Sequence, residues 1–252
     1  MMFHLSPLLN ILYKTIRYSG KNILRDFTEI ENLQSSVKDT NEYINKSLKR
    51  LNENISVNLI KIKKNVSIVD IKQNPLTTCW IVSSVDSTIS YSRGIPEFLI
   101  VVSYRENEKI NECIFYNPIN DEAFLYGIGL GGYKNSVKLR VSEKKKLSDS
   151  LVSVHVADNI NKNNLSKIFE SLIKREIRFR SNNSFFFELS LLSEGKLDAL
   201  IFNTSNQNFK EVTNFVTRET GGFFIECLNK NQNLFIASNK YIGKLLKEMI
   251  EK

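Results

Sequence analysis

The first candidate for chemistry is a carboxylate in a short segment rich in hydroxyl side chains. Residues 80–88 read Trp-Ile-Val-Ser-Ser-Val-Asp-Ser-Thr, so Asp86 comes three residues after Ser83. Two carboxylates at this spacing can hold a pair of Mg²⁺ ions against a phosphate, because Mg²⁺ prefers hard oxygen ligands in octahedral geometry. Here a neutral hydroxyl stands at the first position. One carboxylate is left to compensate the charge of a dication.

The segment resembles the metal-binding core of the inositol monophosphatase family, and within it that of the SuhB-like extragenic suppressor proteins. The family has Trp-Ile-Ile-Asp-Pro-Leu-Asp-Gly-Thr here and then Asn-Phe-x-His-Gly-x-Pro. Two further regions carry the resemblance in family order. They are Tyr-Asn-Pro-Ile-Asn-Asp-Glu-Ala-Phe at 116–124 with Gly129, Gly131, Gly132 and Leu-Arg-Val-Ser at 139–142, and Glu-Gly-Lys-Leu-Asp at 194–198 with Arg-Glu-Thr-Gly-Gly at 218–222 and Ala-Ser-Asn at 237–239.

The resemblance implies a fold. The expected class is α/β, or layered α+β, with the alternating layers of helices and sheets of inositol monophosphatases and sugar phosphatases. The chain is expected to form one domain over residues 1–252, made of two fused halves that meet near 145–150. It further implies a homodimer.

The resemblance also implies that most acidic site positions have changed. Asn41 replaces an Asp that orients the attacking water, and Ile62 falls near a metal-binding Glu, in a stretch, 52–78, where the match is poor. Ser83 and Phe209 stand at two Asp ligand positions. Phe202 falls where a Glu contacts inositol hydroxyls.

Of the family's site residues, the resemblance leaves only Asp86 and Thr88 in this chain. One carboxylate does not assemble the two-metal clamp that activates water and stabilises the leaving oxygen. We therefore expect a degenerate site with no bound cofactor. If the alignment to the family motifs is shifted, Asp39, Asp70 or Glu211 would supply the metal ligands, and the site would be Mg²⁺-dependent.

Two other features offer alternative chemistry. Ser87 and Thr88 are expected at a turn that enters a helix, where free backbone N–H groups could hold an anion without metal; cap chemistry is the competing interpretation. His155 lies in the apolar run 152–156, which favours a core or edge imidazole over a catalytic base. A Ser–His hydrolase has little support.

The charge balance is basic. The chain carries 35 Lys and Arg against 27 Asp and Glu, a formal net charge of +8. The densest clusters, 144–146 and 61–64, do not interleave aromatic residues or match a nucleic-acid motif, so we expect solvated loops. The excess is compatible with an acidic protein or RNA partner.

Composition and periodicity indicate an ordinary cytoplasmic domain. The N-terminal apolar stretch at 8–13 is interrupted by Asn10, too short and polar for a membrane span or signal segment. The 3 cysteines are widely spaced, which favours reduced, buried thiols. Apolar spacing predicts helices over 5–24, 37–51, 165–177 and 241–250, a hairpin from strands 98–104 and 110–116, and strands at 151–156 and 200–202.

Two functions remain open. The favoured hypothesis is a catalytically impaired SuhB-like protein that binds or regulates, with the transcription antitermination machinery as a partner by analogy. The alternative is a Mg²⁺-dependent phosphatase of inositol monophosphate or a related sugar phosphate. A carboxylate cluster facing a cleft would favour the second, whereas Phe209 and Ile62 filling that cleft would favour the first.

Overall fold

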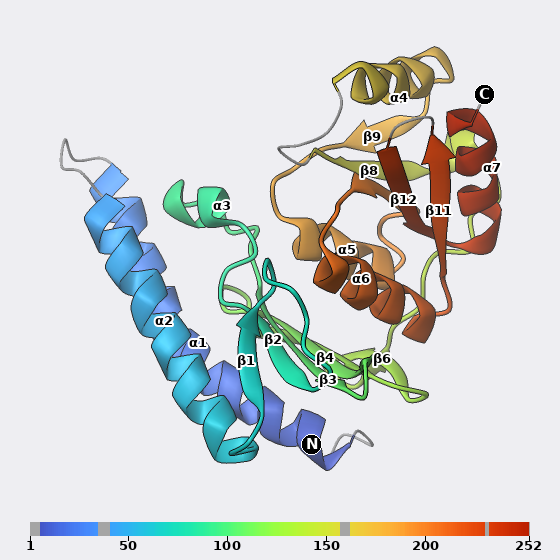
Figure 1. The fold of residues 1–252 in the computed structure, drawn as a ribbon. Helices are drawn as coiled ribbons and strands as arrows, with labels where there is room; N and C mark the ends of the chain where they lie inside the picture. The colour runs from blue at the N-terminus through green and yellow to red at the C-terminus, as the bar shows by residue number, and fades with distance from the viewer. Residues whose placement is uncertain (1–5, 35–40, 157–161, 230–231, 252) are drawn as a thin grey trace.

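The chain folds into five alternating layers of helices and sheets in a computed structural model (Figure 1). The structure describes residues 6–34, 41–156, 162–229 and 232–251. In order, the layers are a helix pair, a seven-stranded sheet, a second helix pair, a five-stranded sheet and two outer helices. The layered α/β class expected from the sequence is confirmed.

The first layer consists of α1 (Pro7–Gln34) and α2 (Asn41–Ile62), which pack against each other. Their apolar side chains recur with helical spacing and are buried against one face of the first sheet, as at Leu12, Ile16 and Leu51. Both helices predicted from the sequence are present. Of the predicted ranges 5–24 and 37–51, residues 5 and 37–40 lie outside the described residues.

The first sheet follows chain order from edge to edge, with β1 parallel to β2 and every later pair antiparallel. Its strands are β1 (Ser67–Asp70), β2 (Cys79–Ser83), β3 (Ile100–Glu106), β4 (Lys109–Asn117), β5 (Glu122–Gly127), β6 (Gly131–Lys134) and β7 (Val137–Lys138). The short helix α3 (Thr88–Ser92) lies between β2 and β3.

Both faces of this sheet are buried, which explains why its central strands are apolar at nearly every position. Alternate side chains on a strand point to opposite faces. In β2, Trp80 and Val82 face the core beneath α1 and α2, while Cys79 and Ile81 face the core beneath the next helices.

The predicted hairpin is confirmed, with a shorter turn. β3 and β4 pair antiparallel; β3 begins and ends two residues later than predicted and β4 begins one residue earlier, so the turn is reduced to Asn107 and Glu108. Both turn residues have positive φ, 50° and 64°, the requirement of the two-residue turn whose twist matches paired strands.

The middle helix layer and the second sheet follow. Helices α5 (Phe185–Ser193) and α6 (Gln207–Glu219) lie between the two sheets (Figure 1). The second sheet has the order β11-β12-β10-β8-β9. Its strands are β8 (Leu151–His155), β9 (Arg178–Arg180), β10 (Ala199–Asn203), β11 (Phe223–Asn229) and β12 (Gln232–Ser238), and a 3₁₀ turn, η1 (Leu147–Asp149), precedes β8.

The outer layer is α4 (Lys162–Lys174) and α7 (Lys240–Ile250), which cover the far face of the second sheet. The helix predicted over 165–177 begins and ends three residues earlier. The helix predicted over 241–250 is present as α7. The apolar spacing of Tyr241, Ile242, Leu246 and Met249 predicts that all four are buried; the last three are, whereas Tyr241 is 51% exposed.

Two further expectations concern compartment. Cys79, Cys113 and Cys227 are unpaired and buried, which confirms the prediction of reduced thiols. No helix in the described ranges combines the length and apolar character required to cross a bilayer.

A glycine at the junction of α6 and β11 tests how tightly the layers fit. A Cβ on Gly222 would lie 2.8 Å from Thr217 Cγ2 and 2.9 Å from the carbonyl oxygen of Ser238. We expect Gly222→Ala to lower the free energy of unfolding by about 1 to 3 kcal/mol, because backbone must move to admit the methyl group. Urea unfolding measures this change.

Its neighbour provides the control. Gly221 has a φ of 79° and no neighbouring atom within 4 Å of a built Cβ, and Asn tolerates this conformation. Gly221→Asn should therefore cost less than about 1 kcal/mol. Equal unfolding midpoints for Gly222→Ala and wild type would contradict the close fit.

Candidate functional site

Asp86 lies in the loop that joins β2 to α3, where it is fixed to the chain ahead of β3. Its backbone N–H donates to the carbonyl oxygen of Leu99 at 3.0 Å. In return, the Leu99 N–H donates to Asp86 Oδ1 at 2.7 Å. This reciprocal pair sets the direction of the carboxylate.

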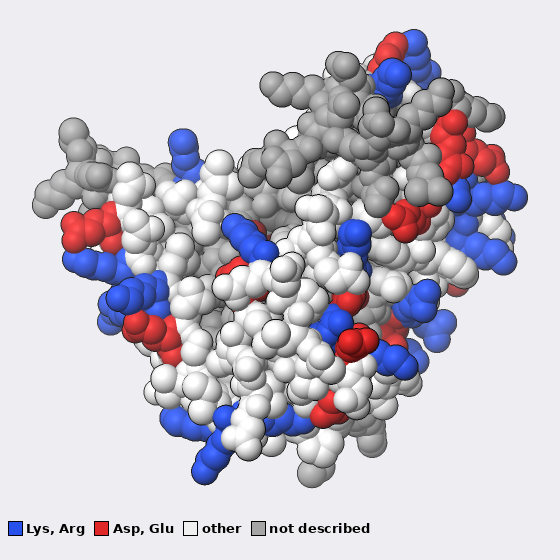
Figure 2. Space-filling model, in the orientation of Figure 1, with Lys and Arg blue, Asp and Glu red and all other residues white. Residues whose placement is uncertain are grey.

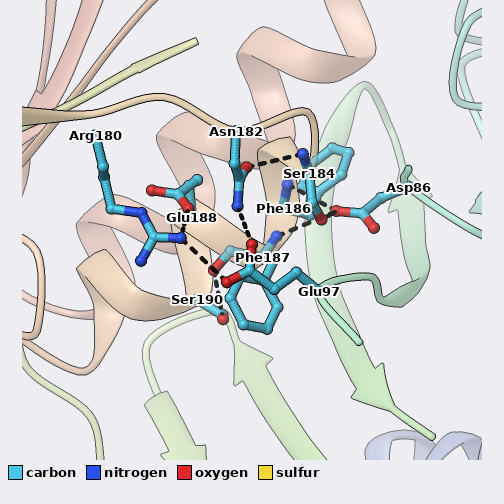
Figure 3. A network of polar contacts seen from close by, with 9 residues as sticks. All are labelled: Asp86, Glu97, Arg180, Asn182, Ser184, Phe186, Phe187, Glu188 and Ser190. Carbon is cyan, nitrogen blue, oxygen red and sulfur yellow. Dashed lines mark hydrogen bonds and ion pairs between the residues drawn. The ribbon is translucent and has the colours of Figure 1, made fainter. Parts of the chain in front are cut away.

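The second carboxylate oxygen caps a helix from the neighbouring layer (Figure 3). Asp86 Oδ2 accepts from Ser184 Oγ at 2.6 Å and from the N–H groups of Phe186 and Phe187 at 3.0 and 3.1 Å. The first N–H groups of a helix have no partner within the helix, and a negative charge there is favourable. Ser184 precedes α5 but makes no side-chain cap bond to that helix. Asp86 supplies the missing acceptor.

An ionic network adjoins this cap. Arg180 Nη2 lies 3.3 Å from Glu97 Oε1 and 3.0 Å from Glu188 Oε1 (Figure 3). Asn182 donates to Glu97 Oε2 at 2.9 Å and accepts from the Ser184 N–H at the same distance. Glu97 follows α3, whereas the other residues belong to β9, α5 and the loop between them, so the network joins the segment before β3 to the start of the middle helix layer.

A cavity of about 290 Å³ opens beside Asp86. Its residues come from the loops after β1 and β2, from β8 and β10 with the residues that follow them, and from both middle helices and the loop before α5. They are Lys72, Asp86, His155, Val156, Asn183, Phe185, Phe202, Asn203, Thr204 and Phe209. Asp86 is the one acid in this lining, and Lys72 brings a positive charge to it.

Aromatic rings fill one wall of the cavity. The Phe209 ring lies 5.4 Å from that of Phe185 and 5.2 Å from that of Phe186, measured between centroids. The Phe202 ring contacts Phe185 at 4.8 Å, and His155 meets Phe185 edge to face at 5.1 Å. Such pairs stabilise beyond the area that they bury. The His155 ring thus packs in the wall, in agreement with the prediction of a core or edge imidazole.

Electrostatics at the cap reflect two opposing effects. Burial raises the pKa of Asp86 from its usual 3.8 to about 6, while the hydrogen bonds from Ser184, Leu99, Phe187 and Phe186 lower it. Burial also raises the pKa of Glu188, and Arg180 beside it acts in the opposite direction. Above pH 6 the Asp86 carboxylate is therefore ionised and held by four donors.

The structure brings together only some of the predicted positions. Asp86, Phe202 and Phe209 line one cavity. Asn41 and Ile62 are the first and last residues of α2, a helix of 22 residues, so about 32 Å of helix separates them. Ile62 packs on the core of the α1–α2 layer. It does not reach the cavity.

The hydroxyl positions Ser83, Ser87 and Thr88 do not line the cavity at Asp86. Ser83 is the buried last residue of β2 and does not line the cavity. Ser87 is the N-cap of α3: its Oγ accepts from the Ser90 N–H at 3.2 Å and donates to Ser90 Oγ at 2.9 Å. Thr88, the first residue of α3, is exposed. These contacts favour cap chemistry over an anion site.

Sequence reasoning missed several residues that line the cavity or hold its acid. Lys72, two residues after β1, was overlooked because the poorly matched stretch before β2 was assigned around Ile62. Ser184 was also missed. A Ser directly before an apolar run is a helix-start signal, and it could have located the turn that Asp86 caps.

Comparison with known proteins agrees with the fold. The family model "Inositol monophosphatase family" matches residues 4–246. The chain is 26% identical over 259 aligned positions to "Inositol-1-monophosphatase" of Rhizobium meliloti, covering 98% of this chain and 97% of that protein. It is 25% identical to "Nus factor SuhB" of Buchnera aphidicola, with 97% of each covered.

A crystal structure of the extragenic suppressor protein SuhB from Bartonella henselae superposes with a TM-score of 0.81 at 20% identity, over 98% of this chain and 100% of that one. The layered fold with its helix pairs between and outside two sheets is thus that of the sugar phosphatase type. The chain belongs to the inositol monophosphatase family.

The residues around Asp86 do not fit a Mg²⁺ site. Across the described ranges, no three His, Cys, Asp or Glu side chains are grouped to hold a metal ion. Magnesium needs several oxygen ligands at short distance. Here both Asp86 oxygens already accept hydrogen bonds, Phe209 forms the wall, and Lys72 is repelled by a dication. No catalytic step through a metal follows from this arrangement.

The raised pKa of Asp86 predicts how the stability of the protein changes with pH. Because the folded-state pKa of Asp86 is raised to about 6, its contribution to stability is full below pH 3.8 and is lost as the pH rises through 6. Asp86→Asn does not titrate and offers fewer acceptors. We expect the variant to be less stable, with the gap to wild type narrowing from pH 4 to pH 7 in urea unfolding. A gap that widens over this range would show that the four donors outweigh burial.

Proposed function

We propose that the chain is a SuhB-like member of the family whose magnesium site is degenerate at Asn41, Ile62, Ser83 and Phe209, and that it acts by binding rather than by hydrolysis. The observation that carries this proposal is the engagement of both Asp86 oxygens by four protein donors. An acid that closes a helix end and joins two layers has a structural role that does not need a metal.

Energetics support the same conclusion. A metal at Asp86 would take an oxygen from donors at the start of α5, and each buried donor left without a partner costs about 1 to 3 kcal/mol. A single carboxylate binds Mg²⁺ weakly in return. The Phe209 ring, held between Phe185 and Phe186, offers no oxygen to complete the shell.

The partner is inferred from the relatives and the charge. Relatives named Nus factor SuhB support a transcription-related partner, and the net charge of +8 favours an acidic protein or RNA, such as components of the antitermination machinery by analogy. We further infer a cytoplasmic homodimer and a single domain over residues 1–252, with two fused halves meeting near 145–150.

The alternative is a Mg²⁺-dependent phosphatase of inositol monophosphate or a related sugar phosphate. The similarity to Inositol-1-monophosphatase of Rhizobium meliloti favours it. In this case Mg²⁺ would be the cofactor and substrate phosphate would have to complete its shell. The two functions make opposite predictions about metal binding.

Metal titration separates them. We expect no heat of Mg²⁺ binding by calorimetry, with or without inositol monophosphate, and no change in melting temperature, because a ligand stabilises only through binding the native state. Choline chloride at matched ionic strength serves as the control. A saturable rise in melting temperature with Mg²⁺ alone would support the phosphatase.

Hydrolysis provides the second test. With millimolar Mg²⁺ and a panel of phosphomonoesters, the protein should release no phosphate above background. The double variant Ser83→Asp with Phe209→Asp should also be inactive, because the other acids are missing and catalytic groups that act as a unit are strongly non-additive. Turnover in wild type that disappears in Asp86→Asn would refute the proposal.

A further inference from the structure

A second and larger cavity lies away from Asp86, where the end of α6, the start of β11 and the start of α7 meet the loops around β6 and β7. Its volume is about 670 Å³. We call it the basic pocket; residues 129–131, 138–143, 145, 218–221, 223 and 239–241 line it. None of these lines the cavity at Asp86. In Figure 2, Lys and Arg side chains gather on the side of the molecule where α6 ends and α7 begins.

Five basic side chains line this pocket from four segments of the chain: Lys138, Arg140, Lys145, Arg218 and Lys240. All five are exposed, and within the described part of the chain none forms an ion pair. Many other basic residues, such as Arg50 and Arg180, do have acidic partners. The pocket therefore concentrates positive charge that the protein itself does not neutralise.

The pocket contains two acids, and one is already engaged. Glu219 accepts hydrogen bonds from the N–H groups of Gly129 and Gly131 at 3.1 and 3.0 Å. These bonds hold the glycine loop against the end of α6. With Glu143 and Glu219 counted, five positive charges face two negative ones, so an anion is the expected ligand.

Two aromatic rings give the pocket an apolar part. Phe223 is 47% exposed and Tyr241 is 51% exposed, although both belong to regular elements with buried neighbours. The Lys145 ammonium lies 5.3 Å from the centroid of the Tyr241 ring. Exposed rings next to unpaired cations match a ligand that has both a planar ring and negative charge.

The walls are held by internal hydrogen bonds, so the pocket is preformed. Asn239 Oδ1 caps α7 by accepting from the Tyr241 and Ile242 N–H groups, both at 2.9 Å. Its Nδ2 donates to Ser142 Oγ at 3.2 Å and to the Lys144 carbonyl oxygen at 3.0 Å. One side chain thus fixes the start of α7 to the loop that carries Lys145.

We propose that the basic pocket binds a nucleotide unit, with its phosphates against Lys138, Arg218 and Lys240 and its base against Tyr241 or Phe223. The volume lies within the range of about 300 to 1,000 Å³ that is typical of small-molecule sites. A free nucleotide and a nucleotide within single-stranded RNA share this chemistry. The proposal does not depend on whether the protein hydrolyses phosphomonoesters, because the two cavities have no residue in common.

The test uses calorimetry with ADP and inorganic pyrophosphate, and fluorescence anisotropy with a labelled single-stranded RNA of about eight nucleotides. Lys138→Gln, Arg218→Gln and Lys240→Gln in one protein should weaken ADP binding about tenfold or more, through lost charge-assisted bonds. Tyr241→Ala should weaken ADP but leave pyrophosphate unchanged, since only ADP has a ring to stack. Thermal unfolding verifies that each variant is folded.

A charge-matched control is available among lysines that do not line the basic pocket. Lys14, Lys64 and Lys109 are exposed and lie outside the basic pocket, and their replacement by Gln removes the same charge. This triple variant should bind as wild type does. Tighter binding of RNA than of ADP would identify single-stranded RNA as the ligand of the pocket. Tighter binding of ADP would identify a free nucleotide.

Three results would overturn the proposal. The first is no saturable binding of any of the three probes. The second is equal loss in the pocket variant and the control variant, which would mean non-specific attraction. The third is binding of an acidic peptide such as oligo-glutamate without binding of ADP or RNA, which would make the pocket a protein contact.

Discussion

The contact between the first sheet and the middle helix layer depends on one carboxylate, which lies in the loop after β2 and caps the first turn of α5. Asp86 lies in the loop after β2, and its carboxylate accepts hydrogen bonds from the first turn of α5. The N-terminus of α5 is therefore fixed to this loop. Arg180 reinforces this contact by joining Glu97 to Glu188. Around this junction the cavity, its aromatic wall and the ionic network take their positions.

The same use of acids recurs elsewhere in the fold. Asp198 accepts from Ser142 Oγ and from the Leu151 N–H at the start of β8, and Glu219 closes the glycine loop beside α6. Each carboxylate accepts from backbone or hydroxyl donors of another segment, and the donors at Gly131, Ser142 and Leu151 are partly buried. These acids thus serve as connections between segments of the chain. No three His, Cys, Asp or Glu side chains of the described residues are grouped to hold a metal ion.

Much of the fold could be predicted from the sequence, because periodic apolar patterns report burial directly. The helices α1 and α2, the β3–β4 hairpin and α7 were found in this way. The ends of α4 were displaced, since element boundaries depend on caps. Tyr241 was misassigned because an aromatic residue at a helical spacing looks buried until its neighbours are known.

The site was harder to predict than the fold. The motif around Asp86 identified its place in the chain, yet the acceptor role of its carboxylate depends on Ser184, Phe186 and Phe187, about a hundred residues away. No local pattern encodes such a pairing. The poor match before β2 placed Ile62 where Lys72 in fact lines the cavity. The spacing of residues within a motif can be read from the sequence, but contacts between distant segments become visible only in the folded structure.

The cap at Asp86 also bears on the order in which the chain acquires its structure. The strands from β2 to β7 pair with sequence neighbours, and such local contacts form early because little loop entropy is lost. The Asp86–α5 contacts span 98 to 101 residues, so during synthesis the first sheet emerges well before its partner helix. Until α5 arrives, the acid remains hydrated. The contacts that join the first sheet to the middle layer at Asp86 therefore form only after most of the chain has been synthesised.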